Sequence, residues 1–345
     1  MIDITQLNGD LEDYLQKNNR EFYIINLGRN IELLSEIKNL IDPYQDKEKI
    51  KFRFTEKIDG VTSIQLVREY LATLGTSYVE KFDEAFQKGI FGFDNSKDRF
   101  YSYSLNRAGV RKGHNYFNVD FKGTLLDSNV LIHEFFHYLN ESTYRSRELL
   151  TEFISIYMEN EYLEFLEQKG YSKNEISKMR VERYLDFYDL TLDLYYETTA
   201  LNLENKLGPI NKKDIHFIKM YQDKLIPSTF EDKDYYKMIE VVASEFYGSS
   251  RCKFDPVVSY EYFFGTLLSS YLLTRKDKDT TKKILELNEK LANGISYSGA
   301  FKILDIDINS IKDSEYIESV NQYYGASIST LNDSKQQQES SFKSI

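Results

Sequence analysis

The chain has 345 residues, with 44 Lys and Arg against 55 Asp and Glu, a formal net charge of −11 and 41% hydrophobic residues. This length and apolar content favour a globular protein with a sizeable core, and the acidic balance disfavours binding to nucleic-acid phosphates. No apolar run approaches the roughly 20 residues of a membrane helix, and the N-terminus lacks a secretory signal pattern. Because Cys252 is the only cysteine, an internal disulfide is excluded. We expect a cytoplasmic protein that binds neither nucleic acid nor membrane.

The N-terminal part of the sequence is predicted to be mostly helical. Amphipathic patterns at residues 4–17 and 29–41 favour two helices, and the run from Glu21 to Leu27 between them is strand-like. A longer helical pattern covers residues 64–89. It is interrupted near Gly75, because glycine weakens a helix interior.

Two strands are predicted in the next part of the chain. Phe100–Leu105 and Tyr116–Phe121 alternate as strands do, and the segment between them holds two glycines, which favours a turn. After residue 123 the pattern becomes helical again. The predicted helices there span 124–138, 147–166, 172–207, 212–225, 232–247, 257–274, 279–292 and 309–323. The sequence therefore predicts a mainly α protein with one small β-sheet.

One segment, His133-Glu134-Phe135-Phe136-His137, has the spacing of a metal site. On a helix, positions i and i+4 share a face, so both imidazoles can reach one ion. Glu134 lies beside that ion, where it can take a proton from a water molecule. Half of the four histidines of the chain lie in this one helical turn. This concentration favours a zinc site over two unrelated core histidines.

The third ligand is expected to be a carboxylate, because no histidine follows His137 until His216. The next predicted helix carries Glu148 and Glu152, one turn apart on nearly the same face. Glu152 is the preferred ligand and Glu148 the second choice. Glu152 lies in the otherwise apolar segment LLTEFISIYM, where a buried carboxylate needs a partner.

Further blocks accompany this motif in a fixed order. They are the helical segment LATLGTSYVEKFDEAFQKGIF, the turn Arg107-Ala108-Gly109-Val110, the run YFNVDFKGTLLDSNVLIHEFFH, the spacing of Glu152, Ser155 and Glu159, and a segment with Pro256, Tyr260, Tyr262 and Gly265. Together they resemble the oligoendopeptidase F and thimet oligopeptidase family of zinc metallopeptidases. The resemblance covers about residues 70 to 305.

This resemblance implies a zincin-like metallopeptidase catalytic domain over residues 70–325, with a substrate cleft between helical lobes. A short N-terminal region, residues 1–69, would pack on it, and residues 326–345 would form a polar, disordered tail. The implied reaction is hydrolysis of short unfolded peptides. The sequence does not indicate an oligomeric state.

The resemblance also implies a role for each site residue. One Zn²⁺ per chain would be held by His133, His137 and Glu152, with Glu134 as general base. Tyr262, and as second choice Tyr260, would donate a hydrogen bond to the developing oxyanion. Ser155 and Glu159 would hold a ligand histidine in its tautomer.

The chain also departs from the family pattern. Its N-terminal region and the connection from His137 to Glu152 are short, and the family histidine before the tyrosine segment is missing. Arg251 could replace that histidine, whereas His114, at the start of the second strand, is better explained as a turn residue than as a substrate contact. These departures favour an alternative, a catalytically weak or inactive zinc-binding descendant that binds a peptide or protein partner in the same cleft.

Overall fold

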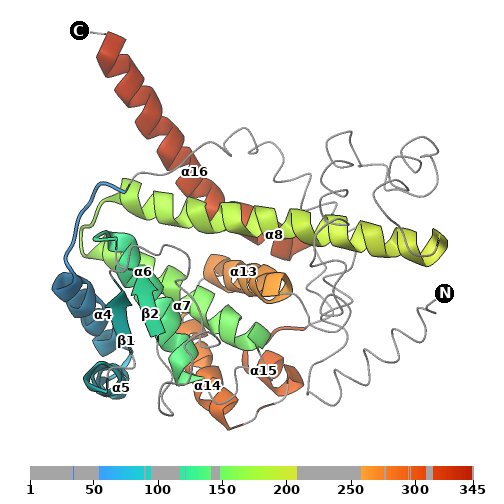
Figure 1. The fold of residues 1–345 in the computed structure, drawn as a ribbon, viewed down its shortest axis with the longest axis horizontal. Coiled ribbons are helices and arrows are strands. Elements are labelled where there is room, and N and C mark those ends of the chain that lie inside the picture. The colour runs from blue at the N-terminus through green and yellow to red at the C-terminus, as the bar shows by residue number, and fades with distance from the viewer. Residues whose placement is uncertain are drawn as a thin grey trace.

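The computed structural model describes residues 34, 54–88, 91–94, 117–120, 122–140, 148–207, 258–275, 277–293, 295, 297–307 and 314–343. Over these residues the chain is mainly helical, as predicted (Figure 1). The elements predicted at 4–17, 21–27, 29–41, 100–105, 212–225 and 232–247 lie outside the described residues, apart from Leu34, which is helical and buried.

Two helices form where one interrupted helix is predicted. Helix α4 spans Gly60–Leu74 and α5 spans Thr76–Gln87, and Gly75 between them has a φ of 143°. An L side chain is strained at this φ, so glycine both ends α4 and permits the change of direction. Helix α4 continues without a break across the boundary expected after residue 69. The expected boundary therefore falls within α4.

Two short strands pair beside these helices. β1, Phe91–Asp94, runs parallel to β2, Phe117–Asp120, with Phe91 opposite Phe117. β2 lies within the strand predicted at 116–121, whereas β1 is not predicted, because FGFD is short and contains a glycine. From β2 the chain passes Gly123 and enters the helix that carries the histidines.

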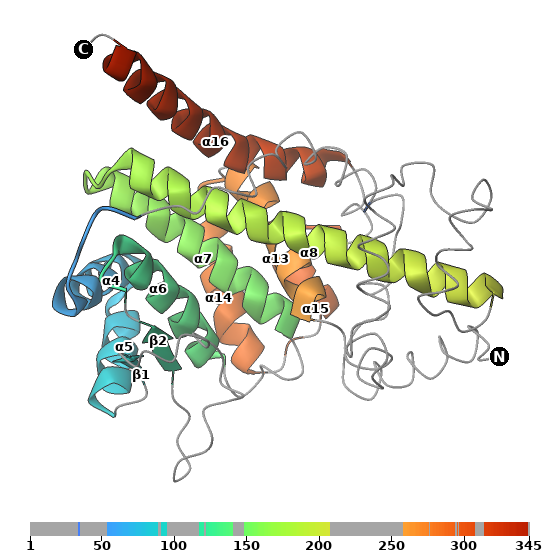
Figure 2. The same cartoon turned by 45° about the horizontal axis from the view of Figure 1, so that its top comes forward.

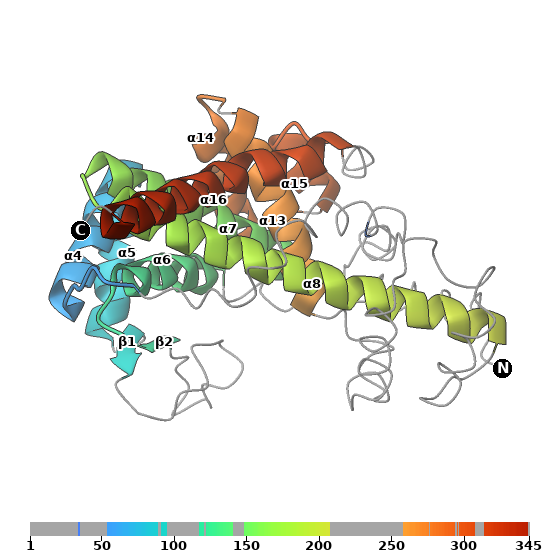
Figure 3. The ribbon, with the colours of Figure 1, turned by 90° about the horizontal axis from the view of Figure 1, so that it is seen from above.

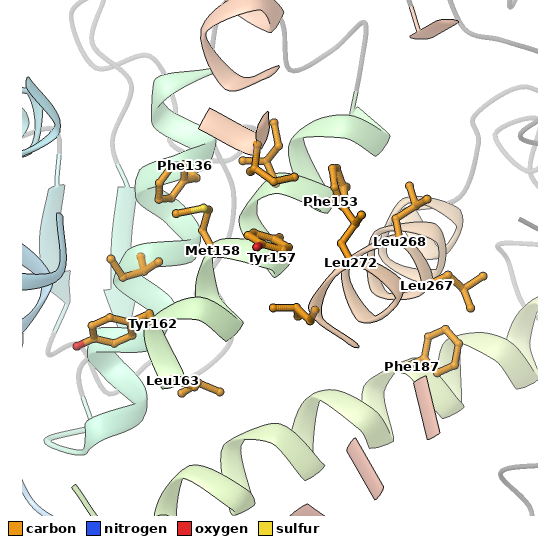
Figure 4. Packing of buried hydrophobic residues seen from close by; sticks show 14 of the residues in the cluster. Phe136, Phe153, Tyr157, Met158, Tyr162, Leu163, Phe187, Leu267, Leu268 and Leu272 are labelled. Carbon is orange, nitrogen blue, oxygen red and sulfur yellow. The ribbon is translucent and has the colours of Figure 1, made fainter. Parts of the chain in front are cut away.

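Helix α7, Glu148–Gln168, is the centre of the packing. It lies between α6, Leu125–Leu139, and α13, Val258–Arg275, while the long α8, Lys173–Leu207, crosses beside them (Figure 2). Figure 4 shows Phe136 of α6, Met158 of α7 and Leu268 of α13 in one buried cluster. Residues 150–160 of α7 are buried on every face, so any carboxylate among them needs a partner.

Side chains cap the starts of α6 and α8. The Asp127 carboxylate accepts hydrogen bonds from the backbone N–H of Lys122 at 3.1 Å and of Thr124 at 2.7 Å, which fixes the start of α6. The backbone N–H of Glu175 donates to Ser172 Oγ at 3.4 Å at the start of α8.

The remaining helices cover the C-terminal part. Helices α14, Thr280–Ala292, and α15, Tyr297–Ile303, precede α16, Ser314–Lys343. Helix α16 lies along α8 when seen from above (Figure 3) and packs on α8 and α13, and its C-terminal end then extends away from them (Figure 1). The structure differs here from the loose tail expected from residue 326, because the chain is helical to Lys343. Gln, Glu and Lys favour helix, and neither Gly nor Pro follows Gly325 in α16. No helix among the described residues is long and apolar enough to span a bilayer.

Gly265 sets the distance between α13 and α7. A Cβ at this position would lie 2.9 Å from Ile156 Cδ1 and 3.2 Å from the backbone nitrogen of Phe153. Gly265→Ala is therefore expected to push the two helices apart. We expect it to lower the free energy of unfolding by about 1–3 kcal/mol, the usual cost of overpacking, in a urea titration.

Gly325→Ala is the matched control, because a Cβ added to this helical glycine of α16 would meet no described atom within 4 Å. There the loss of backbone freedom in the unfolded chain should stabilise the protein by about 0.4–1 kcal/mol. Equal effects of the two alanines on the free energy of unfolding would show that α13 and α7 are not closely packed at Gly265.

Candidate metal centre

Three side chains from two helices converge inside the core. His133 and His137 come from successive turns of α6, and Glu152 comes from the facing side of α7. The two Nε2 atoms lie 3.0 Å apart, Glu152 Oε1 is 3.3 Å from His137 Nε2, and Glu152 Oε2 is 3.5 Å from His133 Nε2. Among the described residues, these are the side chains that could hold a metal ion, and they are the three predicted ligands.

The spacing of these atoms fits one ion. Two ligands at ~2.0–2.1 Å from a tetrahedral centre lie about 3.3–3.4 Å from each other. The three separations here, 3.0, 3.3 and 3.5 Å, lie around that value. Two imidazoles and a carboxylate are also the donor types that transition metals favour. A metal ion could therefore bind all three side chains with little movement.

Burial makes a charge partner necessary. His133, His137 and Glu152 are 5%, 4% and 1% exposed. A carboxylate removed from water to this extent is costly unless it is paired or binds a cation. The same need of a buried carboxylate for a partner favours Glu152 over Glu148 in the sequence. Glu148 is the first residue of α7, and its side chain is outside the described set.

A second carboxylate orients His133 from the other side. Glu159 Oε2 lies 2.9 Å from His133 Nδ1, as the predicted role of Glu159 requires. Arg183 of α8 in turn donates from Nε to Glu159 Oε1 at 2.8 Å and from Nη2 to Oε2 at 2.7 Å. The sequence analysis does not identify Arg183. No spacing connects it to the histidine motif, because packing between α7 and α8 sets their register.

Tyr262 lies beside the centre. Its ring is parallel to that of His133, at 8° and with 6.2 Å between centroids. Arg183 Cζ is 5.9 Å from the centroid of the Tyr262 ring. Tyr260 also belongs to α13, but its side chain is outside the described set, as are residues His114, Arg251 and Cys252.

The predicted contact of Ser155 is not formed. Its side chain is fully buried on α7, between Glu152 and Glu159 in the sequence, but its hydroxyl makes no hydrogen bond to any described residue. Helical spacing places Ser155 on the same face as the two carboxylates. It does not determine whether a short side chain can reach across to α6.

Charges in the centre reinforce one another. Burial lowers the pKa of His133, but the hydrogen bonds and charges of Glu152 and Glu159 outweigh it and raise that pKa to about 10. Burial also raises the pKa of both carboxyl groups, but nearby charges outweigh it. His137 and His133 hold the pKa of Glu152 below its usual value. Arg183 and His133 hold the pKa of Glu159 below its usual value. Glu152 and Glu159 are therefore kept ionised beside the imidazoles.

Glu134 has a different environment. It follows His133 directly in α6 and is 9% exposed, more than His133, His137 or Glu152. Burial raises its pKa, and the nearby histidines only partly oppose this. Glu134 thus differs from Glu152 and Glu159, whose pKa values are lowered, and a carboxyl with a raised pKa is better suited to accept a proton.

Comparisons with known proteins give no match to this chain, whether against protein-family models, curated proteins or solved structures.

Proposed function

We propose that this protein is a zinc metallopeptidase that hydrolyses short unfolded peptides, with Glu134 as general base. The observation that carries the proposal is the convergence of His133, His137 and Glu152 with an acid placed between the two histidines. The resemblance of the sequence to the oligoendopeptidase F and thimet oligopeptidase family, which has a zincin-like catalytic domain, supports the same conclusion. Cytoplasmic location is part of this proposal.

Zinc, when bound by these three residues, would lower the pKa of a water molecule to about 7 and polarise the scissile carbonyl. Glu134 would accept a proton from the attacking water and pass it to the leaving amine. Tyr262 would donate a hydrogen bond to the developing oxyanion. Glu159 would keep His133 in the tautomer that leaves Nε2 free for the ion.

The direct test is incubation of the purified chain with a mixed peptide library, read by mass spectrometry with and without a chelator. Cleavage that stops with the chelator and returns with zinc is the expected result. Binding of zinc and of peptides without cleavage would instead identify the alternative, a zinc-binding descendant that recognises a peptide or protein partner. A chain that neither binds zinc nor cleaves would contradict both.

Tyr262→Phe tests the proposed hydrogen-bond donor. The substitution keeps the ring that lies parallel to His133 and removes only the hydroxyl. Loss of one oxyanion donor costs about 10²–10³ in turnover, so we expect a fall of this size in kcat with zinc content and folding retained. Tyr260→Phe is expected to have a smaller effect.

Tyr271→Phe is the control on the same helix. Tyr271 stacks on Tyr316 with 4.0 Å between centroids, and its hydroxyl accepts a hydrogen bond from Arg275 at 3.0 Å. Its loss should affect stability but not turnover. Parent-like kcat in both the Tyr262 and Tyr260 variants would leave the tyrosine segment with a packing role alone.

A further inference from the structure

We propose that Arg183 is the positioning residue of the metal centre, because one guanidinium fixes both the ring of His133, through Glu159, and the ring of Tyr262. The inference rests on the proposed function for the presence of zinc, but not for peptide cleavage. Arg183 lies on α8, Glu159 on α7 and Tyr262 on α13, so a single side chain connects three helices at the site.

The first part of the argument concerns Glu159. A carboxylate with one histidine partner can rotate about its side-chain bonds. Here Arg183 binds both oxygens, at 2.8 Å and 2.7 Å, in the bidentate geometry that only a guanidinium offers. The carboxylate plane is therefore fixed, and with it the position of Oε2, which lies 2.9 Å from His133 Nδ1.

The second part concerns the ring of His133. A metal ion displaces one proton from the ring, and in the neutral imidazole that binds it, the hydrogen bond from Nδ1–H to Glu159 Oε2 leaves Nε2 as the unprotonated nitrogen. Nε2 is the atom that lies 3.0 Å from His137 Nε2 and 3.5 Å from Glu152 Oε2. Arg183 thus controls both the tautomer and the direction of a proposed metal ligand that it does not touch.

The third part concerns Tyr262. Its ring centroid is 5.9 Å from Arg183 Cζ, within the range of a cation–π interaction, and its plane is only 8° from that of His133. The same guanidinium therefore holds the proposed oxyanion donor in a fixed relation to the ligand. Removal of Arg183 should loosen both residues together.

Arg180 provides a matched control one turn earlier on α8. Its Nη1 donates to Glu167 Oε1 at 2.7 Å, and its Cζ is 5.6 Å from the Tyr323 ring centroid. It has the same combination of an ion pair and an aromatic ring, but neither partner belongs to the metal centre. Comparison of Arg183 with Arg180 separates positioning from general stabilisation of α8.

The experiment measures zinc affinity of the full chain by competition with a chromophoric chelator, and the visible spectrum of the cobalt(II)-loaded chain. Arg183→Met should weaken zinc binding roughly 10–100-fold, the usual effect of losing a partner behind a ligand histidine, and should change the cobalt spectrum. Arg183→Lys should fall between this variant and the parent, because an ammonium cannot bind both oxygens as a fork. Arg180→Met should leave both measurements unchanged.

Folding is checked by thermal unfolding of each variant. If Arg183→Met does not fold, because the buried Glu159 carboxylate keeps only His133 as a partner among the described residues, Arg183→Lys decides the question. Parent-like zinc affinity and cobalt spectrum in a folded Arg183 variant would overturn the inference and leave the proposed function intact. A parent chain that binds zinc but cleaves no peptide would overturn the proposed function alone, and one that binds no zinc would overturn both.

Discussion

Glu152→Gln is expected to remove zinc binding, although it changes the shape of the side chain very little. The substitution replaces a charged carboxylate, whose Oε1 lies 3.3 Å from His137 Nε2, by a neutral amide. Removal of a residue that only hydrogen-bonds to a metal ligand weakens metal binding roughly 10–100-fold. The loss of zinc affinity in Glu152→Gln should be larger than this. The measurement is zinc per chain after dialysis, together with the thermal midpoint, which zinc should raise in the parent and not in the variant.

Glu148→Gln is the matched control, one turn earlier on the same helix. Glu148 is the first residue of α7, where an acid is already favourable because of the helix dipole. We expect parent-like zinc content for this variant. A greater loss of zinc in Glu148→Gln than in Glu152→Gln would overturn the choice of third ligand. His133→Ala and His137→Ala should match Glu152→Gln.

Glu134→Gln is expected to abolish peptide hydrolysis while zinc remains bound. Glu134 lies in the same turn of α6 as His133 and His137 but is not one of the three side chains that converge, which are these two histidines and Glu152. An amide cannot accept the proton from the attacking water, and loss of a general base costs about 10²–10⁴ in rate. Turnover of a peptide found in the library experiment and zinc content should be measured on the same sample.

Asp127→Asn controls for removal of a carboxylate from α6. Asp127 accepts hydrogen bonds from backbone N–H groups at the start of the helix, two turns before Glu134. Its replacement should cost about 1 kcal/mol of stability and leave zinc content and turnover unchanged. If Glu134→Gln lost zinc, or cleaved peptides at the parent rate, its assignment as general base would be wrong.

The sequence determined the local parts of this site. The two histidines share a face because the α-helix repeats every 3.6 residues, so their spacing alone predicts that His133 and His137 come together. Gly75 and Asp127 likewise act within their own turn, as a helix break and a cap. The choice of Glu152 also follows from its neighbours, since an acid in an apolar segment needs a partner.

Only the tertiary structure decided that Arg183 of α8 joins the centre. Tyr262 of α13 was expected from the family resemblance, but its position beside His133 also depends on how these helices pack on α7. Ser155 has the expected helical spacing and yet makes no hydrogen bond to a histidine. Periodicity fixes the face of a helix on which a residue lies, whereas distance across an interface depends on side-chain packing such as the close approach at Gly265.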